Sequence, residues 1–284
     1  MKSKSDVFTR ILTALTISPF VVLCFVSYKS LVGLVATVVF FASYEYLTFS
    51  LKGHGHTIVR LLVNTLVVLS TMFYGLALEK FVYSNDNAKR PELVFLIIMI
   101  AISSIVIFSI KDPKKAKDFV VNGIFSLFYV AMNLSFFFPI YLKFGASLAL
   151  LTLVSVWVYD AGAYFIGMRF GRIRISPSYS PKKSLEGVIG GFVTTFLFFL
   201  IYETAREILL SGEIFTLSAV NSLILSAVVA FFGTVGDIVE SSFKRYHNVK
   251  DSGSILPGHG GMLDRIDGLL FVVPMFYIFL ILFS

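Results

Sequence analysis

The sequence predicts an all-α protein, a polytopic transmembrane helical bundle of about nine spans, and three observations lead to this class. Of the 284 residues, 57% are hydrophobic and only 14% are charged, whereas soluble domains are roughly 45–50% apolar. The mean hydropathy is +0.86. The apolar residues also gather in windows of about 20, the length that crosses a hydrocarbon core as a helix. We therefore expect the lipid bilayer to be the medium of this chain.

Nine windows are apolar enough to span a membrane. In order they are residues 11–28, 31–51, 58–79, 93–110, 119–142, 145–168, 187–203, 215–238 and 266–283. The first has the position of a signal peptide, but it is long and has no obvious small-residue cleavage site, so we expect a retained helix. No low-complexity linker divides the chain, which predicts a single membrane domain over residues 1–284.

Lysine and arginine are divided unevenly between the two sides that these spans create. If the spans alternate in direction, one side of the membrane receives only Lys29, Lys80, Lys89, Arg90, Lys143 and Arg206, which leaves 18 of the 24 cations for the other. Cytoplasmic loops collect positive charge. We therefore expect the cell (inner) membrane, with the N-terminus in the cytoplasm, the C-terminus outside, and segments 169–186 and 239–265 facing the cytoplasm.

Composition also narrows the class of function. Cys24 is the sole cysteine of the sequence, which excludes an internal disulfide and a cysteine-built metal site. The net charge of +7 comes from cations between apolar spans, so we expect anionic ligands and lipids as partners and no nucleic acid. Neither an internal repeat nor a matching pair of interrupted spans is evident, which disfavours many transporter folds.

Polar residues with helical spacing lie at and just beyond the end of the eighth window. Asp237, Glu240, Ser241 and Lys244 fall three or four residues apart, so they share one face if the helix continues. A carboxylate at membrane depth is costly in lipid and usually faces the bundle interior or a water-filled cavity. Simple pairing of Asp237 and Glu240 with Lys244 is an equally good interpretation of these residues taken alone.

A glycine-rich segment follows at residues 250–261 and cannot form a regular helix, because it contains four glycines and Pro257. Backbone amides in such loops bind anions. Cations suited to several phosphates surround it, namely Lys244, Arg245, Lys250, His259 and Arg265. A loop that only touches anionic headgroups would explain this charge, but it would not explain the glycines and the histidine.

Asp264 and Asp267 begin the last window, three residues apart, so their carboxylates project the same way near a helix N-terminus. Each alone is equally typical of a helix cap. Together with Asp237, and beside phosphate-binding cations, they form a set of hard oxygen ligands typical of Mg²⁺ held by carboxylates and substrate phosphates. The combination predicts phosphoryl or nucleotidyl transfer.

Other polar residues lie in or beside apolar spans. Asp160 in the sixth window is a candidate site residue. Lys182 and Lys183 either bind phosphate or only mark the cytoplasmic face. Glu45 in the second window is either a functional carboxylate or an acid that is protonated or hydrogen-bonded within the bundle. Close packing between helices is the role expected of Gly162, Gly167, Gly190 and Gly191.

The segment from Ser241 to Asp267 resembles the signature of the phosphatidate cytidylyltransferases, also called CDP-diacylglycerol synthases. The matching positions are Ser241, Lys244, Arg245, Lys250, Asp251, Pro257, His259, Gly260, Gly261, Asp264, Arg265 and Asp267. Segments 160–164 and 180–187 also look like upstream motifs of the family, so the resemblance covers residues 155–270. Residues 151–284 thus carry the signature as catalytic helices and loops, while residues 1–150 match only in hydrophobic character.

The resemblance implies transfer of the cytidylyl group of CTP to phosphatidic acid, which yields CDP-diacylglycerol and pyrophosphate in phospholipid biosynthesis. It implies Mg²⁺, and in places K⁺, as cofactors, and it leaves a homodimer open. The implied catalytic residues are Asp237, Lys244, Arg245, Lys250, His259, Asp264, Arg265 and Asp267, of which Asp237, Asp264 and Asp267 would hold the metal. Anchors for CTP or the lipid phosphate would be Lys182, Lys183, Ser184, Gly260 and Gly261.

Two alternatives stay open at this point. A CTP-dependent kinase of a membrane polyprenol would need the same nucleotide, a metal and a cytoplasmic site. A cation transporter with an ion path through Glu45, Asp160 and Asp237 belongs to a different class, and it leaves the cation-rich glycine loop unexplained.

Overall fold

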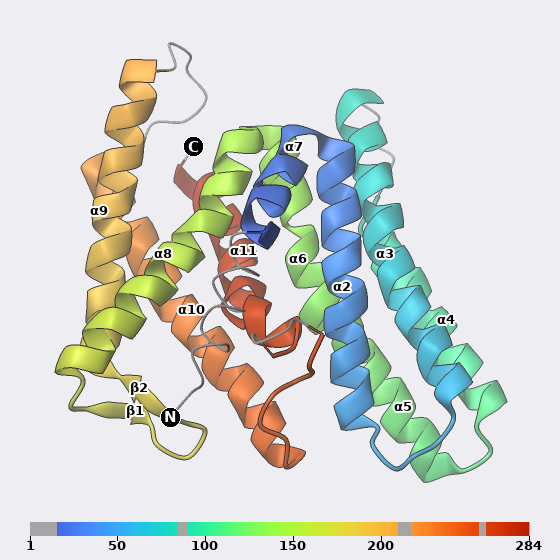
Figure 1. The fold of residues 1–284 in the computed structure, drawn as a ribbon. Helices are drawn as coiled ribbons and strands as arrows, with labels where there is room; N and C mark the ends of the chain where they lie inside the picture. The colour runs from blue at the N-terminus through green and yellow to red at the C-terminus, as the bar shows by residue number, and fades with distance from the viewer. Residues whose placement is uncertain (1–15, 85–89, 210–216, 256–259, 284) are drawn as a thin grey trace.

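The computed structural model describes residues 16–84, 90–209, 217–255 and 260–283. Helices make up nearly all of this part of the chain, and most of the long ones run between the same two ends of the molecule (Figure 1). The elements are η1 (Cys24–Val26), α2 (Tyr28–Ser50), α3 (Thr57–Ser84), α4 (Leu93–Ser109), α5 (Pro113–Ser126), η2 (Leu127–Met132), α6 (Asn133–Ser135), α7 (Phe137–Phe144), α8 (Ala146–Phe170), β1 (Arg174–Ser176), β2 (Ser180–Ser184), α9 (Leu185–Leu209), α10 (Ala219–Tyr246) and α11 (Leu263–Phe283).

Seven helical stretches of the described chain are long and apolar enough to cross a membrane. They are Tyr28–Ser50, Thr57–Tyr83, Pro113–Phe144, Ala146–Phe170, Leu185–Glu207, Ala219–Tyr246 and Leu263–Phe283. The polytopic helical class predicted from the sequence is therefore confirmed. Windows 11–28 and 93–110 hold shorter apolar helices, Thr16–Val26 and Leu93–Ser109, and residues 11–15 lie outside the described part.

The stretch from α5 to α7 begins six residues before its predicted window at 119–142. Its first turn carries lysines, which lowered the apolar signal, but Asp112 caps it by accepting hydrogen bonds from the amides of Lys114 at 2.9 Å and Lys115 at 3.3 Å. Pro113 occupies the first helical turn, where its missing N–H costs nothing. A wider π-helical turn at η2 then interrupts the stretch.

Helix α10 continues to Tyr246, about two turns beyond its predicted window. The polar segment 237–245 is thus helical, as the spacing of Asp237, Glu240, Ser241 and Lys244 required. The antiparallel hairpin of β1 and β2 was not predicted. Its strands are too short and too exposed to show an alternating hydrophobic pattern.

The glycines assigned to helix packing do bring α8 and α9 together. A Cβ on Gly162 would lie 2.0 Å from the Thr194 hydroxyl, and one on Gly191 would lie 2.6 Å from the Tyr159 ring. Gly190 and Gly167 meet Ile166 and the Gly187 backbone in the same way. This confirms that small residues allow close approach of the two helices.

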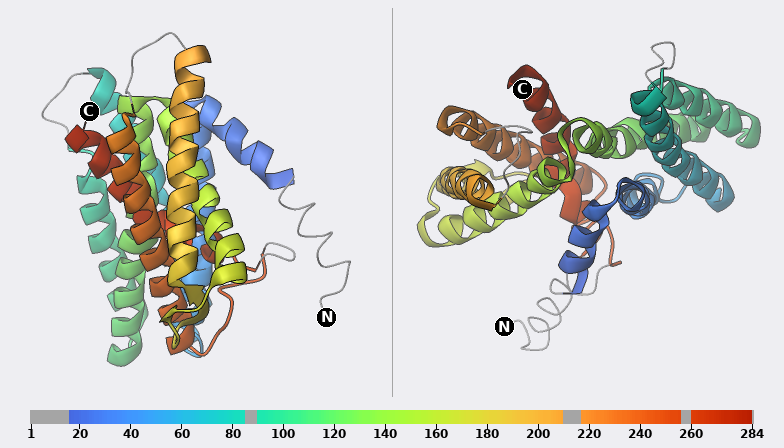
Figure 2. Two further views of the ribbon diagram at one scale, coloured as in Figure 1. Left: turned by 90° about the vertical axis from the view of Figure 1, so that its left-hand side faces the viewer. Right: turned by 90° about the horizontal axis from the view of Figure 1, so that it is seen from above.

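The connections α2–α3, α4–α5, α8–α9 and α10–α11 all lie at one end of the bundle, the lower end in Figure 1. Basic segments 169–186 and 239–265 therefore meet there, as the alternating spans predicted. The short helix Thr16–Val26 instead projects obliquely from the bundle (Figure 2).

Candidate active site

The crossing of α10 and α11 places two acidic positions side by side. A Cβ on Gly236 would lie only 2.3 Å from the carbonyl oxygen of Asp267 and 3.2 Å from the Cα of Gly268. Only glycine fits at such a contact between two backbones. Because Asp237 and Asp267 adjoin this contact, their carboxylates enter the same region.

Carboxylates from three helices gather around this crossing. Asp267 interacts electrostatically with Asp237 and Glu240 of α10 and with Asp160 of α8. Asp237 also forms an ion pair with Lys183, which lies on strand β2 of the hairpin. The hairpin, although absent from the sequence prediction, therefore closes one side of the site.

Lys244 links this cluster to the glycine-rich loop. Its buried ammonium contacts Glu240, one turn away on α10, and lies 2.5 Å from Oδ1 of Asp264. The other oxygen of Asp264 accepts hydrogen bonds from the amides of Ser252 at 3.0 Å and Gly261 at 2.9 Å. Asp264 thus ties both ends of the loop to α10.

The structure leaves other predicted site residues outside this network. Arg245 is exposed and donates to the carbonyl of Val249 at 3.1 Å, and Lys182, Lys250 and Arg265 are exposed as well. These cations remain available to an anionic ligand at the same end of the bundle. His259 lies outside the described residues.

Ser184, expected as a phosphate anchor, is buried against the α8–α9 glycines. Its hydroxyl accepts the amide of Gly187 at 3.2 Å, which is the geometry of a helix N-cap. Gly260 has φ of +85°, a left-handed conformation that glycine adopts without strain. Both residues therefore shape the backbone of the site.

Glu45 is the residue whose role the sequence left undecided. The structure places it, from α2, against the start of α11, where it accepts the amides of Met262 and Leu263 at 2.9 Å each. An acid inside an apolar span is a functional candidate by default. That signal marked the residue, but nothing in the sequence identified a partner more than 200 positions away.

The site fits a divalent cation by the chemistry of its donors. It holds five carboxylates, those of Asp160, Asp237, Glu240, Asp264 and Asp267. It holds three cations, those of Lys183, Lys244 and Arg265. Clustered carboxylates repel one another when ionised, and a divalent cation such as Mg²⁺, which prefers hard oxygen ligands, would offset that repulsion. Oε1 of Glu240 is also buried without a hydrogen-bond partner among the described residues.

As arranged here, no three described His, Cys, Asp or Glu side chains form a ready coordination sphere. Asp237 points its carboxylate at Lys183. Ionised carboxylates have about four lone-pair sites, and Asp264 uses three of them. A metal held by these carboxylates would require side-chain rotation, chiefly of Asp237 away from Lys183.

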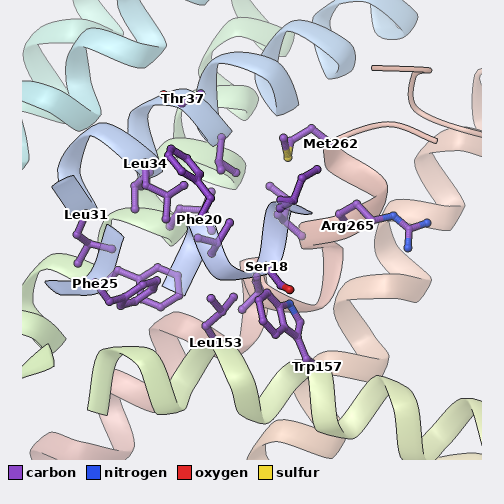
Figure 3. Close-up of a pocket in the computed structure, with 18 of the residues that line it drawn as sticks. Ser18, Phe20, Phe25, Leu31, Leu34, Thr37, Leu153, Trp157, Met262 and Arg265 are labelled. Carbon is purple, nitrogen blue, oxygen red and sulfur yellow. The ribbon is translucent and has the colours of Figure 1, made fainter. Parts of the chain in front are cut away.

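An apolar cavity of about 570 Å³ adjoins the cluster. Its walls come from the Thr16–Val26 helix, α2, α6, α7, α8 and α11, and Figure 3 shows Phe25 and Leu31 at one end and Arg265 at the other. Asp160 lines the cavity too. This combination of apolar walls with a few convergent polar groups is typical of a small-molecule site.

Fold and site together define a polytopic membrane protein with a cluster of carboxylates and cations at one end of its bundle. The chain belongs to the cytidylyltransferase family, whose model matches residues 8–283. A phosphatidate cytidylyltransferase of Thermotoga maritima is 46% identical over 273 residues, which cover 96% of each chain. That of Haemophilus influenzae is 34% identical over 74% of this chain and 78% of its own, and that of Bacillus subtilis 31% over 71% and 72%.

The family match is broader than the motifs alone indicated. Their resemblance covered residues 155–270, whereas the family model extends to residue 8 and takes in α2 with Glu45. The first half of the chain therefore belongs to the same family unit as the signature.

Proposed function

We propose that this chain is a phosphatidate cytidylyltransferase, which transfers the cytidylyl group of CTP to phosphatidic acid. The observation that carries the proposal is the convergence of the predicted site residues. Asp237, Lys244, Asp264 and Asp267, from two helices, form one network with the glycine-rich loop. Family membership supports the same activity.

In this reaction a phosphate oxygen of phosphatidic acid attacks the α-phosphorus of CTP. A new P–O bond forms, the bond from the α-phosphorus to the α,β-bridging oxygen breaks, and pyrophosphate leaves. The nucleophile is already an anion, so no general base is needed. The protein's task is to neutralise charge and to hold the two anionic substrates in line.

Each group of residues has a proposed part in that task. Asp237, Asp264 and Asp267 hold Mg²⁺, which when bound supplies charge neutralisation at the triphosphate. The exposed cations Lys182, Arg245, Lys250 and Arg265 bind the phosphates directly, with Lys183 joining them once Asp237 turns to the metal. Lys244 holds the carboxylates of Glu240 and Asp264 in place through its two ion pairs. His259, Gly260 and Gly261 contribute the loop, and K⁺ is a candidate second cation.

The apolar cavity is the proposed place for an acyl chain of the lipid substrate. Its walls are hydrocarbon over most of their extent, and Arg265 and Asp160 connect it to the carboxylate cluster. A lipid with its tail in the cavity would bring its phosphate to Arg265. The site would face the cytoplasm, as the excess of Lys and Arg in the loops at this end predicts.

Replacing Leu153, a buried lining residue of α8, by Trp should narrow the cavity. We expect the KM for long-chain phosphatidate to rise about tenfold, because the lost apolar contact is worth about 1.4 kcal/mol, while the KM for CTP stays the same. Steady-state assays with long- and short-chain lipids in mixed micelles measure both. An equal effect on the two lipids, or on CTP, would show that the acyl chain lies elsewhere.

Substrate omission tests the activity as a whole. Purified protein with Mg²⁺, CTP and phosphatidic acid should release pyrophosphate and form a CDP-lipid, and it should do neither when a polyprenol replaces the phosphatidic acid. Formation of CDP and a polyprenyl phosphate would instead identify the alternative, a CTP-dependent lipid kinase. Repeating the same assay with and without K⁺ measures whether the reaction needs this second cation.

A further inference from the structure

A buried carboxylate of the N-terminal half closes the glycine-rich loop. Glu45 of α2 is only 3% exposed. Its Oε2 accepts hydrogen bonds from the Ser252 hydroxyl and the Leu263 amide, and its Oε1 accepts the Met262 amide, each at 2.9 Å. One side chain therefore contacts the loop where it leaves α10 and where it enters α11.

The loop backbone is shaped to receive this carboxylate. A Cβ on Gly253 would lie 2.4 Å from Oε1 of Glu45, and one on Gly261 would lie 2.5 Å from Oε2. Larger residues at either position would push the carboxylate out. Two glycines of the predicted anion-binding loop thus leave room for a protein carboxylate.

No cation balances Glu45 in the described part of the chain, where it forms no ion pair within 4.0 Å. Two of its donors are amides at the N-terminus of α11, where the helix dipole favours a negative charge. A buried carboxylate needs such donors to offset its lost hydration. Glu45 therefore serves as a cap for α11 that another helix provides.

The same loop ends are bound by the proposed metal ligand. Asp264 accepts the amides of Ser252 and Gly261, and Glu45 accepts the Ser252 hydroxyl and the two amides that follow Gly261. Glu45 and Asp264 therefore both bind the two ends of the loop. Because Ser252 binds Glu45 through its hydroxyl and Asp264 through its amide, displacement of Ser252 would disturb both contacts.

We infer that Glu45 is a positioning residue for the reaction, which fixes the glycine-rich loop and the start of α11 so that Asp264 and Asp267 can bind the metal. It does so through two acceptor oxygens and without contacting substrate. The kinetic consequence of this inference rests on the proposed function. The clamp, by which we mean the hydrogen bonds that Ser252, Met262 and Leu263 donate to Glu45, can be measured without turnover.

Glu45→Gln is the sharpest test, because it keeps the size of the side chain and changes one acceptor oxygen into an NH₂ donor. That donor must face either the Met262 amide or the Leu263 amide and Ser252 hydroxyl. Ser43→Ala is the matched control on the same helix, since Ser43 is equally buried and its hydroxyl bonds to Asn64 at 2.6 Å, away from the loop.

Hydrogen–deuterium exchange on the full chain in detergent measures the clamp. Glu45→Gln should raise uptake in peptides covering 247–255 and 260–266 and leave the β1–β2 hairpin unchanged, whereas Ser43→Ala should leave all three unchanged. The Mg²⁺ concentration for half-maximal turnover should rise at least about tenfold in Glu45→Gln, as for other groups that orient metal ligands, with no rise in Ser43→Ala.

Unchanged exchange at both loop ends would overturn the inference, and so would raised exchange with an unaltered Mg²⁺ dependence, which would mark Glu45 as merely structural. If Glu45→Gln does not fold, Ser252→Ala removes one of its three donors and should cause the same two changes with smaller size. Absence of CDP-lipid formation by the unaltered protein would refute the proposed function, whereas the exchange result would still decide on the clamp.

Discussion

Asp267→Asn is expected to lower turnover by about a thousandfold, since a bound metal contributes several kcal/mol of transition-state stabilisation. The same change should not destabilise the metal-free protein. Asp267 interacts with Asp160, Asp237 and Glu240, and removing one of several like charges relieves repulsion. The thermal midpoint without Mg²⁺ is therefore expected to equal or exceed that of the unaltered protein.

The thermal shift produced by Mg²⁺ separates a metal ligand from a structural residue. A ligand that binds only the folded state raises the midpoint, so the unaltered protein should gain stability with Mg²⁺ and Asp267→Asn should not. Asp118→Asn is the control, because Asp118 is a half-exposed carboxylate that pairs with His54 away from the site. Near-normal turnover, or a lower midpoint with and without Mg²⁺, would refute the metal role of Asp267.

Gly236→Ala should remove activity by a different route. The new Cβ would meet the carbonyl oxygen of Asp267 at 2.3 Å, and a backbone atom cannot turn aside as a side chain would. We expect α10 and α11 to separate, with a loss of about 1–3 kcal/mol in stability and at least about a hundredfold in turnover, because displacement of catalytic groups by 1 Å has such an effect.

Gly33→Ala provides the comparison for that variant. Gly33 lies within α2, and a Cβ there would meet nothing within 4 Å. Alanine is favoured over glycine in a helix by about 1 kcal/mol, so activity should be unchanged and the thermal midpoint equal or higher. If Gly236→Ala also keeps full activity, close contact of the two helices is not what positions Asp237 and Asp267.

The sequence predicted the features that depend on local pattern. Apolar windows located the spans, and the spacing of Asp237, Glu240 and Lys244 anticipated one helical face, because helix periodicity is a short-range property. The predicted ends of helices were less accurate where the helix carries charged residues. The polar end of α10 and the lysine-rich start of α5 are helical, but both lie outside their apolar windows.

Contacts between distant segments could not be predicted in this way. The hairpin that delivers Lys183 to Asp237 has no hydrophobic pattern, and the partners of Glu45 lie 207 to 218 residues further along the chain. The sequence also could not distinguish a phosphate anchor from a helix cap at Ser184, because both roles use the same hydroxyl. Only the packing of the helices decides such cases.

The fate of the phosphates of CTP tests the central claim most directly. Purified protein is incubated with Mg²⁺, phosphatidic acid and CTP that carries label either at the α-phosphate or at the γ-phosphate, and the lipid fraction is counted. Cytidylyl transfer predicts that the α-label enters the lipid in equal amount to the pyrophosphate released, and that the γ-label stays in the aqueous phase. Appearance of the γ-label in lipid, or of no label in lipid, would contradict the assignment.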